Sequence, residues 1–191
     1  MTRRIVVTGL GVVSALSQKV SDLWTRVLAG ESGIHSIKLF DTTDFKVTIG
    51  GDIYDWDPSE YISHKESKRV DRFTQLSIVA GTDAVRDSGL DLEKTAADRC
   101  GVILGSGIGG LSEIETQNSK LLQKGPDRVS AMTVPKMMLN AAGANLAIQF
   151  GMRGPNFTVA TACASANNAI GEAIKAIRDD ECDVILTGGT E

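Results

Sequence analysis

The sequence predicts an α/β fold in which helices cover both faces of a mainly parallel or mixed sheet. Three apolar runs are rich in β-branched residues and end at glycine, as buried strands do: "RRIVVTG" at 3–9, "CGVILG" at 100–105 and "CDVILTGG" at 182–189. Segments with helical spacing of apolar residues separate these runs, which is typical of βαβ units. Half-exposed antiparallel strands alternate apolar and polar residues, so continuous apolar runs favour a parallel sheet covered on both faces.

The first part of the chain predicts one helix and one irregular segment. Residues 20–30, "VSDLWTRVLAG", carry apolar residues at helical spacing, with Ser21 as the predicted N-cap and Gly30 as the predicted end. Residues 31–63 contain turn signals and no sustained periodicity, so we expect irregular structure with short strands.

Two longer helices are predicted in the centre of the chain. Residues 71–90 have helical apolar spacing and end near Gly89. Residues 134–151 predict a single apolar helix, with Pro135 tolerated in its first turn. A strand over 154–161, "GPNFTVAT", follows. The sequence then stops directly after the last strand, so we expect it to be the N-terminal part of a longer protein.

Composition indicates a soluble globular protein and excludes several classes of function. Of 191 residues, 42% are apolar and 23% charged, and the net charge is −4, whereas nucleic-acid-binding proteins are usually basic. No run approaches the roughly 18 apolar residues of a membrane span. Thr8, Gly9 and Gly11 interrupt the apolar start, which argues against a signal peptide. We therefore expect a cytoplasmic protein with neither a membrane nor a nucleic-acid partner.

The three cysteines and two histidines predict neither a disulfide framework nor a metal site, because they are few and scattered. We expect reduced thiols, no metal and no tightly bound cofactor. Cys100 and Cys182 each stand at the head of an apolar strand, and we interpret both as packing residues.

The glycine loop after the second strand leaves an alternative function open. Gly105, Gly107 and Gly110 in "GSGIGG" match the G-x-G-x-x-G pattern of dinucleotide-binding domains. That pattern also needs an acidic residue about 20 positions on, at the end of a second strand. Asp127 stands near that offset but follows a turn. An NAD(P)-binding domain therefore remains the weaker alternative, and a tight turn or close backbone approach is the other interpretation of these glycines.

Cys163 is the candidate nucleophile, because it lies where the strand over 154–161 ends and an alanine-rich helix begins. The unpaired N–H groups and the dipole at a helix start favour a thiolate by about 0.3–2 kcal/mol. The same N–H groups suit an oxyanion formed when the thiolate attacks a carbonyl. Lowering the pKa of a thiol by two units takes about 2.7 kcal/mol, so another group, such as a histidine, has to contribute.

Three segments resemble the β-ketoacyl-acyl-carrier-protein synthases, most closely their type II members: "RRIVVTGLGVVSAL", "GVILGSGIGG" and "GPNFTVATACASANNAIGEAIKAIRDDECDVILTGGTE". The resemblance implies a thiolase-like fold of which residues 1–191 are the N-terminal half. It implies decarboxylative condensation of a malonyl group with an acyl group held on Cys163, whose own N–H forms part of the oxyanion hole. It further implies that Ile108 and Thr133 line the acyl pocket, Thr133 across a homodimer interface. The implied partner is the acyl carrier protein of fatty acid elongation, which delivers the phosphopantetheine.

The sequence departs from the family pattern in two ways. Ala166 stands where relatives often have glycine, and we expect tighter packing there. The family takes two histidines and a lysine from its second half, and we interpret His35 and His64 as ordinary surface or loop residues. We therefore predict that the 191-residue chain is inactive alone. A non-catalytic partner like the chain-length factors of polyketide systems is a further alternative, although those proteins replace the cysteine that is present here.

A basic cluster precedes the second long helix. Lys65, Lys68, Arg69 and Arg72 lie together in the sequence, interleaved with two acidic residues, so a solvated charged stretch is one interpretation. The resemblance supports the other, in which Lys65, Lys68 and Arg69 dock the acidic carrier protein. Such a patch would raise the rate of encounter more than the affinity.

Overall fold

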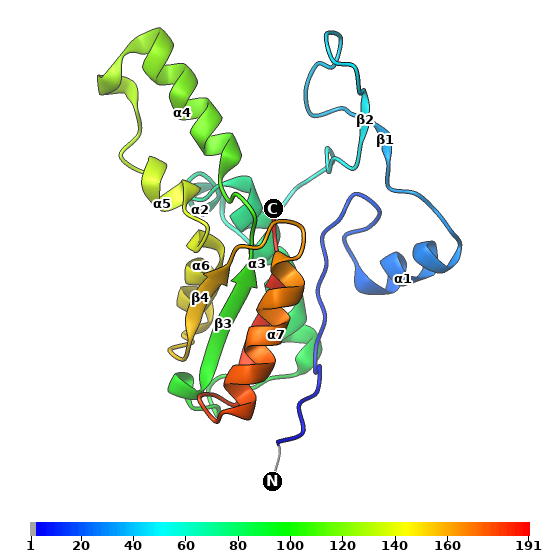
Figure 1. Cartoon of the computed structure of the whole chain (residues 1–191), viewed down its shortest axis with the longest axis vertical. Helices are drawn as coiled ribbons and strands as arrows, with labels where there is room; N and C mark the ends of the chain where they lie inside the picture. Colours follow the sequence, from blue (N-terminus) through cyan, green and yellow to red (C-terminus); the bar gives the residue numbers. More distant parts are fainter. Residues whose placement is uncertain (1–2) are drawn as a thin grey trace.

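The computed structural model describes residues 3–191 and is built on a three-stranded parallel sheet (Figure 1). The strands are β3 (Cys100–Gly105), β4 (Asn156–Val159) and β5 (Val184–Gly189), in the order β4-β3-β5. In the register, Val102 of β3 lies opposite Asn156 and Leu186. The predicted α/β class and parallel sheet are confirmed for this chain.

Helices cover both faces of the sheet, as predicted. Helix α7 (Ser165–Arg178) packs on one face against β3 and β5, while α6 (Ala141–Phe150) and α3 (Arg72–Ser88) lie on the other (Figure 1). Every residue of β3 is buried, and its side chains alternate between the two layers. Val102 joins the cluster beneath α3 and α6, and Ile103 joins the cluster beneath α7. A strand covered on both sides has no polar face, which explains the continuous apolar run.

The remaining elements are short or stand away from the sheet. Residues 31–63 are irregular apart from one two-residue antiparallel ladder, as predicted. Among residues 3–191, no helix is both long and apolar enough to cross a bilayer. The elements outside the three-stranded sheet and its covering helices are α1 (Val20–Leu28), β1 (His35–Ser36), β2 (Ile49–Gly50), α2 (His64–Ser67), η1 (Ala97–Arg99), α4 (Leu111–Lys124), η2 (Pro126–Arg128) and α5 (Thr133–Met137).

The predicted helix ends are correct for α3 and only half correct for α1. Helix α3 ends at Gly89, which adopts the left-handed φ of +64° that glycine tolerates best. Helix α1 is followed by Gly30 at φ +72°, as expected. The predicted cap Ser21 is wrong, because α1 starts at Val20, so that Ser21 lies inside the helix, and the N-cap Lys19 makes no side-chain cap bond. The hydroxyl oxygen of Ser17 instead accepts a hydrogen bond from the Lys19 N–H at 3.0 Å and shapes the turn before the helix.

The single helix predicted over 134–151 is wrong, because the chain breaks between α5 and α6. Met138 is extended, with ψ 136°. The carbonyl of Met137 accepts a hydrogen bond from Gly110 N–H at 3.1 Å. A contact with the glycine loop therefore replaces continuation of the helix, which apolar periodicity cannot reveal.

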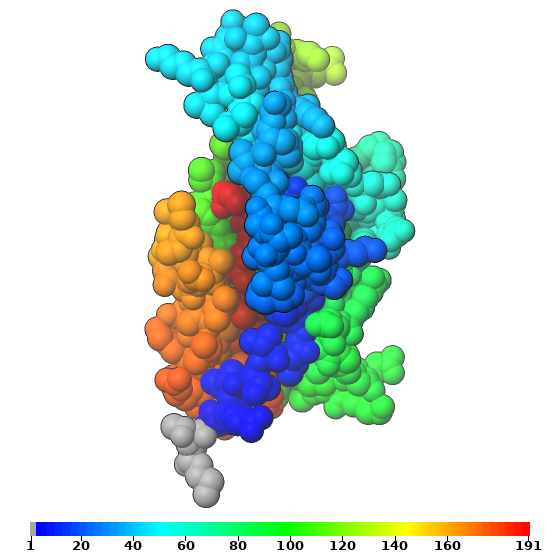
Figure 2. Space-filling model, turned by 90° about the vertical axis from the view of Figure 1, so that its right-hand side faces the viewer, coloured from blue at the N-terminus to red at the C-terminus, as the bar shows by residue number. Residues whose placement is uncertain are grey.

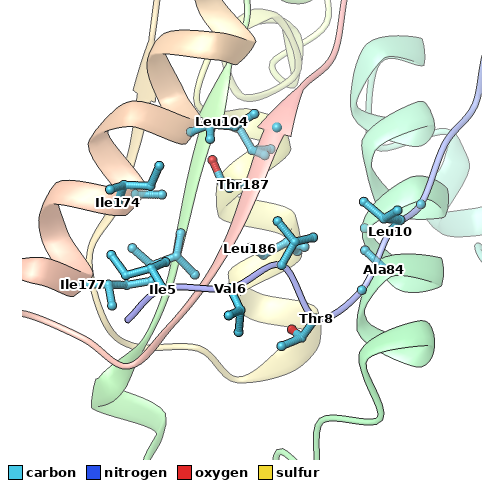
Figure 3. A pocket seen from close by; sticks show the side chains of 18 of the residues that line it. Ile5, Val6, Thr8, Leu10, Ala84, Leu104, Ile174, Ile177, Leu186 and Thr187 are labelled. Carbon is cyan, nitrogen blue, oxygen red and sulfur yellow. The ribbon is translucent and has the colours of Figure 1, made fainter. Parts of the chain in front are cut away.

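The predicted first strand over 3–9 is also wrong. The segment is extended but pairs with no strand, and Val7 is 80% exposed. Arg3 anchors one end through the carbonyls of Ile177 and Cys182, and the N–H of Leu10 bonds to Asp87 at the other. The segment thus crosses from α7 to α3 and leaves a cavity of about 600 Å³ beside β5 (Figure 3). Figure 2 shows this N-terminal chain (blue) over the surface between α7 (orange) and the green segments opposite.

Glycine holds the crossing segment close to α3. A Cβ added at Gly11 would lie 1.9 Å from the carbonyl oxygen of Ala80, and one added at Gly9 would lie 2.2 Å from that of Ala84. These contacts draw the chain onto the helix backbone instead of onto the free edge of β5. The apolar run therefore lines the cavity beside β5 and stays largely exposed, instead of forming a buried strand.

An ion cluster joins β5, η1 and the N-terminal segment and predicts acid sensitivity. Asp183 contacts Arg99 at 2.9 Å and also Arg3, and these two guanidinium groups, Arg99 first, hold the pKa of Asp183 well below its usual range. A lowered folded-state pKa stabilises the fold above the unfolded value of about 4 and loses that contribution as the pH falls below it. We expect Asp183→Asn to lower the melting temperature at neutral pH and the deficit to shrink in acid. A deficit that is constant across pH in thermal melts would contradict this.

Candidate active site

The candidate nucleophile lies on a sharp turn between β4 and α7. Cys163 is exposed, and Ala162 before it has a φ of +52°, a left-handed conformation that alanine rarely adopts. Helix α7 begins two residues later, at Ser165. Backbone strain of this kind persists only where surrounding contacts fix it, and it is concentrated at functional sites.

A buried serine fixes the turn. Ser165 is 4% exposed, and its hydroxyl donates to the carbonyl of Ala162 at 2.7 Å while accepting the N–H of Thr161 at 2.8 Å. The amide of Asn168 also donates to the Thr161 hydroxyl at 2.6 Å. These bonds tie the residues before Cys163 to the first turn of α7, so the backbone that carries the thiol is held in one position.

Two glycines let the turn lie directly on the strand ends. A Cβ added at Gly105 would lie 2.2 Å from the backbone carbon of Ser165, and one added at Gly189 would lie 2.6 Å from the Cβ of Ala166. The tight packing expected at Ala166 is therefore confirmed. All three strands run the same way, so the turn, the glycine loop after β3 and the residues after β5 meet at one edge of the sheet. Ligands of parallel sheets bind at this carboxyl edge.

Several backbone N–H groups near Cys163 have no acceptor among the described residues. Within residues 3–191, the N–H groups of Cys163, Ala166 and Asn167 make no hydrogen bond. The latter two belong to the first turn of α7, where a helix leaves its donors unpaired. An exposed thiol beside unpaired N–H groups can attack a carbonyl and stabilise the resulting oxyanion.

The glycine loop does not offer a dinucleotide site. The N–H groups of Gly107 and Ile108 already donate to the carboxylate of Glu191, at 2.6 and 2.9 Å respectively. At the start of α4, the N–H of Glu113 donates to Asp71 at 2.8 Å. The donors that would hold a pyrophosphate thus already bind carboxylates.

Comparison with known proteins places this chain in a family. Residues 2–191 match the family model described as the N-terminal domain of β-ketoacyl synthase. The chain belongs to the β-ketoacyl synthase family. The NAD(P)-binding alternative is therefore wrong.

Two curated relatives are similar to this chain in sequence along almost its whole length. The synthase domain is 41% identical over 189 residues to a 3-oxoacyl-[acyl-carrier-protein] synthase 2 of Staphylococcus aureus (strain COL), and 42% identical to that of Vibrio cholerae. Each match covers 99% of this chain and 46% of the relative, so the chain spans about half the length of these curated relatives.

Solved structures confirm the thiolase-like fold. The ishigamide ketosynthase/chain length factor superposes with a TM-score of 0.91 at 28% identity, over 99% of this chain and 47% of that one. A type II polyketide ketosynthase, solved in complex with its acyl-carrier protein, gives 0.81 at 23% identity, over 96% of this chain and 49% of that one.

The other two cysteines are buried packing residues, as predicted. Cys100 is 1% exposed and Cys182 is not exposed, and burial raises the pKa of both thiols. We expect iodoacetamide to alkylate Cys163 on the order of 100-fold faster than either, because reaction requires an accessible thiolate. Peptide mapping by mass spectrometry measures this ratio. Comparable labelling of Cys100 or Cys182 in the folded synthase domain would contradict the assigned environments.

The two histidines contribute to other parts of the structure. The ring nitrogens of His35 contact the carbonyls of Ser36 and Asp52, at 3.0 and 3.1 Å, in the β1–β2 ribbon. His64 is exposed at the start of the four-residue helix α2. Both act as ordinary surface or loop residues in the structure, as interpreted from the sequence.

The two predicted pocket residues lie on neighbouring segments. Ile108 is 56% exposed on the glycine loop, and a Cβ added at Gly107 would lie 3.9 Å from the Cα of Ala162, so the loop borders the cysteine turn. Thr133 begins α5 and donates to the carbonyl of Ser130 at 2.6 Å. Because Gly110 bonds to Met137 of the same helix, α5 packs against the loop that carries Ile108.

The predicted docking residues are exposed, with one change to the cluster. Lys65, Lys68 and Arg69 point to solvent, and the ion pairs within residues 3–191 include none of them. Arg72 is different, because it bonds to the carbonyl of Ile53 and burial lowers its pKa. Arg72 therefore does not belong to the exposed cluster.

Sequence reasoning missed three residues that shape this region. Ser165 fixes the turn, and Asp71 caps both α3 and α4 through the N–H groups of Phe73 and Glu113. Asp71 carries a recognisable signal as an N-cap residue before a predicted helix. The contact of Glu191 with the glycine loop joins residues more than 80 positions apart and has no local signal.

Proposed function

We propose that the full-length protein is a 3-oxoacyl-acyl-carrier-protein synthase that elongates fatty acids in the cytoplasm, with Cys163 as its nucleophile. The observation that carries the proposal is the exposed Cys163 on a fixed turn beside unpaired N–H groups. The two curated relatives named above are 3-oxoacyl-[acyl-carrier-protein] synthases, which supports the same reaction.

The geometry suits the first step of the proposed reaction. The thiolate of Cys163 attacks the carbonyl of the acyl thioester, and the Cys163 N–H stabilises the oxyanion. Collapse of the intermediate expels the carrier's phosphopantetheine thiolate, which takes up a proton, and leaves the acyl group on Cys163.

Condensation follows on the same sulfur. A malonyl-carrier loses CO₂, and the resulting carbanion attacks the acyl thioester and releases the Cys163 thiolate. The product is a carrier-bound 3-oxoacyl chain that is two carbons longer. The proposal needs no metal and no resident cofactor, because the phosphopantetheine arrives with the carrier.

A homodimer is part of this proposal. Strand β4 lies at one end of the sheet order, and within residues 3–191 its outer edge has no partner strand. Phe157 on this strand is 42% exposed. Unpaired edges with apolar side chains are templates for pairing with a second chain. A dimer formed through β4 would bring the Thr133 segment of one subunit towards the acyl pocket of the other.

The retained cysteine argues against a non-catalytic partner role. Chain-length factors replace the nucleophile, and here Cys163 is both present and accessible.

The decisive test is an assay of the full-length enzyme with acyl-carrier and malonyl-carrier substrates. We expect CO₂ release and a 3-oxoacyl-carrier product that is two carbons longer. The 191-residue chain is the negative control. We expect no condensation from it, since its two histidines belong to the β1–β2 ribbon and to α2 and not to the turn that carries Cys163. Product formed by the pure 191-residue chain would refute the need for the second half.

Carrier docking predicts a selective effect of charge. Reversing Lys65, Lys68 and Arg69 to glutamate in the full-length enzyme should lower kcat/KM for acyl-carrier substrates by roughly 10-fold or more, because steering by exposed charges controls encounter. Turnover of short pantetheine thioesters should change little. Lys175→Glu on α7, a charge reversal in the same direction at another site, is the control. Equal losses on both substrates would rule out docking at this patch.

A further inference from the structure

Glu191 joins the end of β5 to the glycine loop through three contacts. Its carboxylate accepts the N–H of Gly107 at 2.6 Å and the N–H of Ile108 at 2.9 Å, and the hydroxyl of Ser106 at 3.2 Å. Consecutive backbone N–H groups that converge on one anion form a nest, and such nests hold their loop in one conformation. The contact is therefore a specific clamp on the loop.

The position of Glu191 is itself fixed by the sheet. The N–H of Thr190 donates to the carbonyl of Gly105 at 3.0 Å, and its hydroxyl donates to the carbonyl of Phe73 at 2.6 Å. These bonds extend the β3–β5 ladder by one residue and attach it to the start of α3. The carboxylate is thus presented to the loop from the end of β5.

The clamped loop borders the nucleophile. A Cβ added at Gly107 would meet Glu191 Oε2 at 3.3 Å and the Cα of Ala162 at 3.9 Å. The carboxylate, the loop and the turn that carries Cys163 therefore converge at this glycine. Ile108, whose N–H is clamped, is the loop residue with a large apolar side chain free to meet a ligand.

We infer that Glu191 is a positioning residue that sets the acyl-chain preference of the enzyme by fixing the glycine loop and Ile108 beside Cys163. The inference rests on the proposed function, since it assigns to Glu191 the shape of the acyl pocket and not the chemistry. Loss of the clamp frees Ile108 to move, and a pocket with a mobile wall discriminates less between chains of different length.

The test compares Glu191→Gln with Glu115→Gln in the full-length enzyme. The glutamine at 191 keeps one acceptor but turns a donor towards a backbone N–H, whereas Glu115 is exposed on α4. Acylation rates are measured with acyl-carrier substrates of several chain lengths. We expect the ratio between the fastest and slowest chains to fall about 10-fold in Glu191→Gln, the factor that one hydrogen bond to a charged group can supply. Glu115→Gln should leave the ratio unchanged.

A second measurement does not depend on activity. Hydrogen exchange of the Gly107 and Ile108 amides should be faster by about 10-fold in Glu191→Gln, because their acceptor is weakened. Iodoacetamide, which needs no acyl pocket, should alkylate Cys163 within about twofold of the unaltered rate. Glu191→Asp, which keeps the charge, should restore much of the amide protection.

The outcomes separate the two proposals. An unchanged chain-length ratio in Glu191→Gln, or unchanged amide exchange, overturns the role of Glu191. A parallel fall in acylation of every chain and in alkylation also overturns it, because it indicates general loss of structure. If the unaltered enzyme places no acyl group on Cys163, the proposed function fails, while the exchange measurement still decides whether Glu191 holds the loop.

Discussion

Replacing Cys163 by serine in the full-length enzyme should abolish the acyl-enzyme. The turn keeps its geometry, because its bonds come from Ser165 and Thr161 and not from the thiol. A serine hydroxyl is barely ionised at neutral pH and needs a strong base, so attack on the thioester should slow by at least about 10³-fold. Intact-protein mass spectrometry after incubation with acyl-carrier should show the added acyl mass in the unaltered enzyme and none in the variant.

The other cysteines supply the control for this experiment. Cys182→Ala removes a fully buried thiol from the cluster beneath α7 and should cost stability without removing the adduct. An adduct that persists in Cys163→Ser, or that disappears only in Cys182→Ala, would show that Cys163 is not the nucleophile. Unfolding curves of both variants show whether a lost adduct reflects chemistry or misfolding.

Local patterns in the sequence predict the three parallel strands and the position of the candidate nucleophile, because both depend on residues close together in the chain. The run 100–105 is apolar since helices cover both its faces, and Gly89 ends α3 because it adopts a left-handed φ. The strand, Cys163 and the alanine-rich helix follow one another directly, so the sequence alone places the candidate nucleophile at a helix start.

The errors arise where a distant contact decides the local structure. The segment 3–9 has the composition of a buried strand, yet anchors at α7 and α3 hold it across a cavity. The helix predicted over 134–151 breaks because Met137 bonds to the glycine loop. Arg72 has the same sequence context as Arg69, but its side chain turns inward to the carbonyl of Ile53.

The glycines at the strand ends show how a residue without a side chain can control the site. Gly105 terminates β3 directly beneath the cysteine turn, and its backbone conformation is one that other residues can adopt. Its constraint is space alone. Gly171 lies within α7, and a Cβ added there would meet no atom within 4 Å. Substitution at Gly105 therefore tests the cost of a steric clash, whereas substitution at Gly171 tests the conformational entropy of a glycine in a helix.

Gly105→Ala should destabilise the chain strongly, and Gly171→Ala should stabilise it. The methyl group at 105 would lie 2.2 Å from the backbone of Ser165, which cannot retreat without breaking the bonds that hold Thr161 and Ala162. Overpacking against fixed backbone costs about 3 kcal/mol, a melting temperature lower by roughly 6–12 °C in a chain of this size. Alanine at 171 removes the entropic penalty of a helical glycine and should add about 0.5–1 kcal/mol.

Thermal and denaturant unfolding of the two variants test this argument, and alkylation of Cys163 extends it to function. Movement of the turn in Gly105→Ala should also alter the labelling rate of Cys163, whereas Gly171→Ala should leave it unchanged. Similar stability changes in both variants would mean that glycine acts through backbone freedom alone. A stable Gly105→Ala protein with normal labelling would show instead that the turn does not rest on the end of β3, and the fixed position of the thiol would then need another cause.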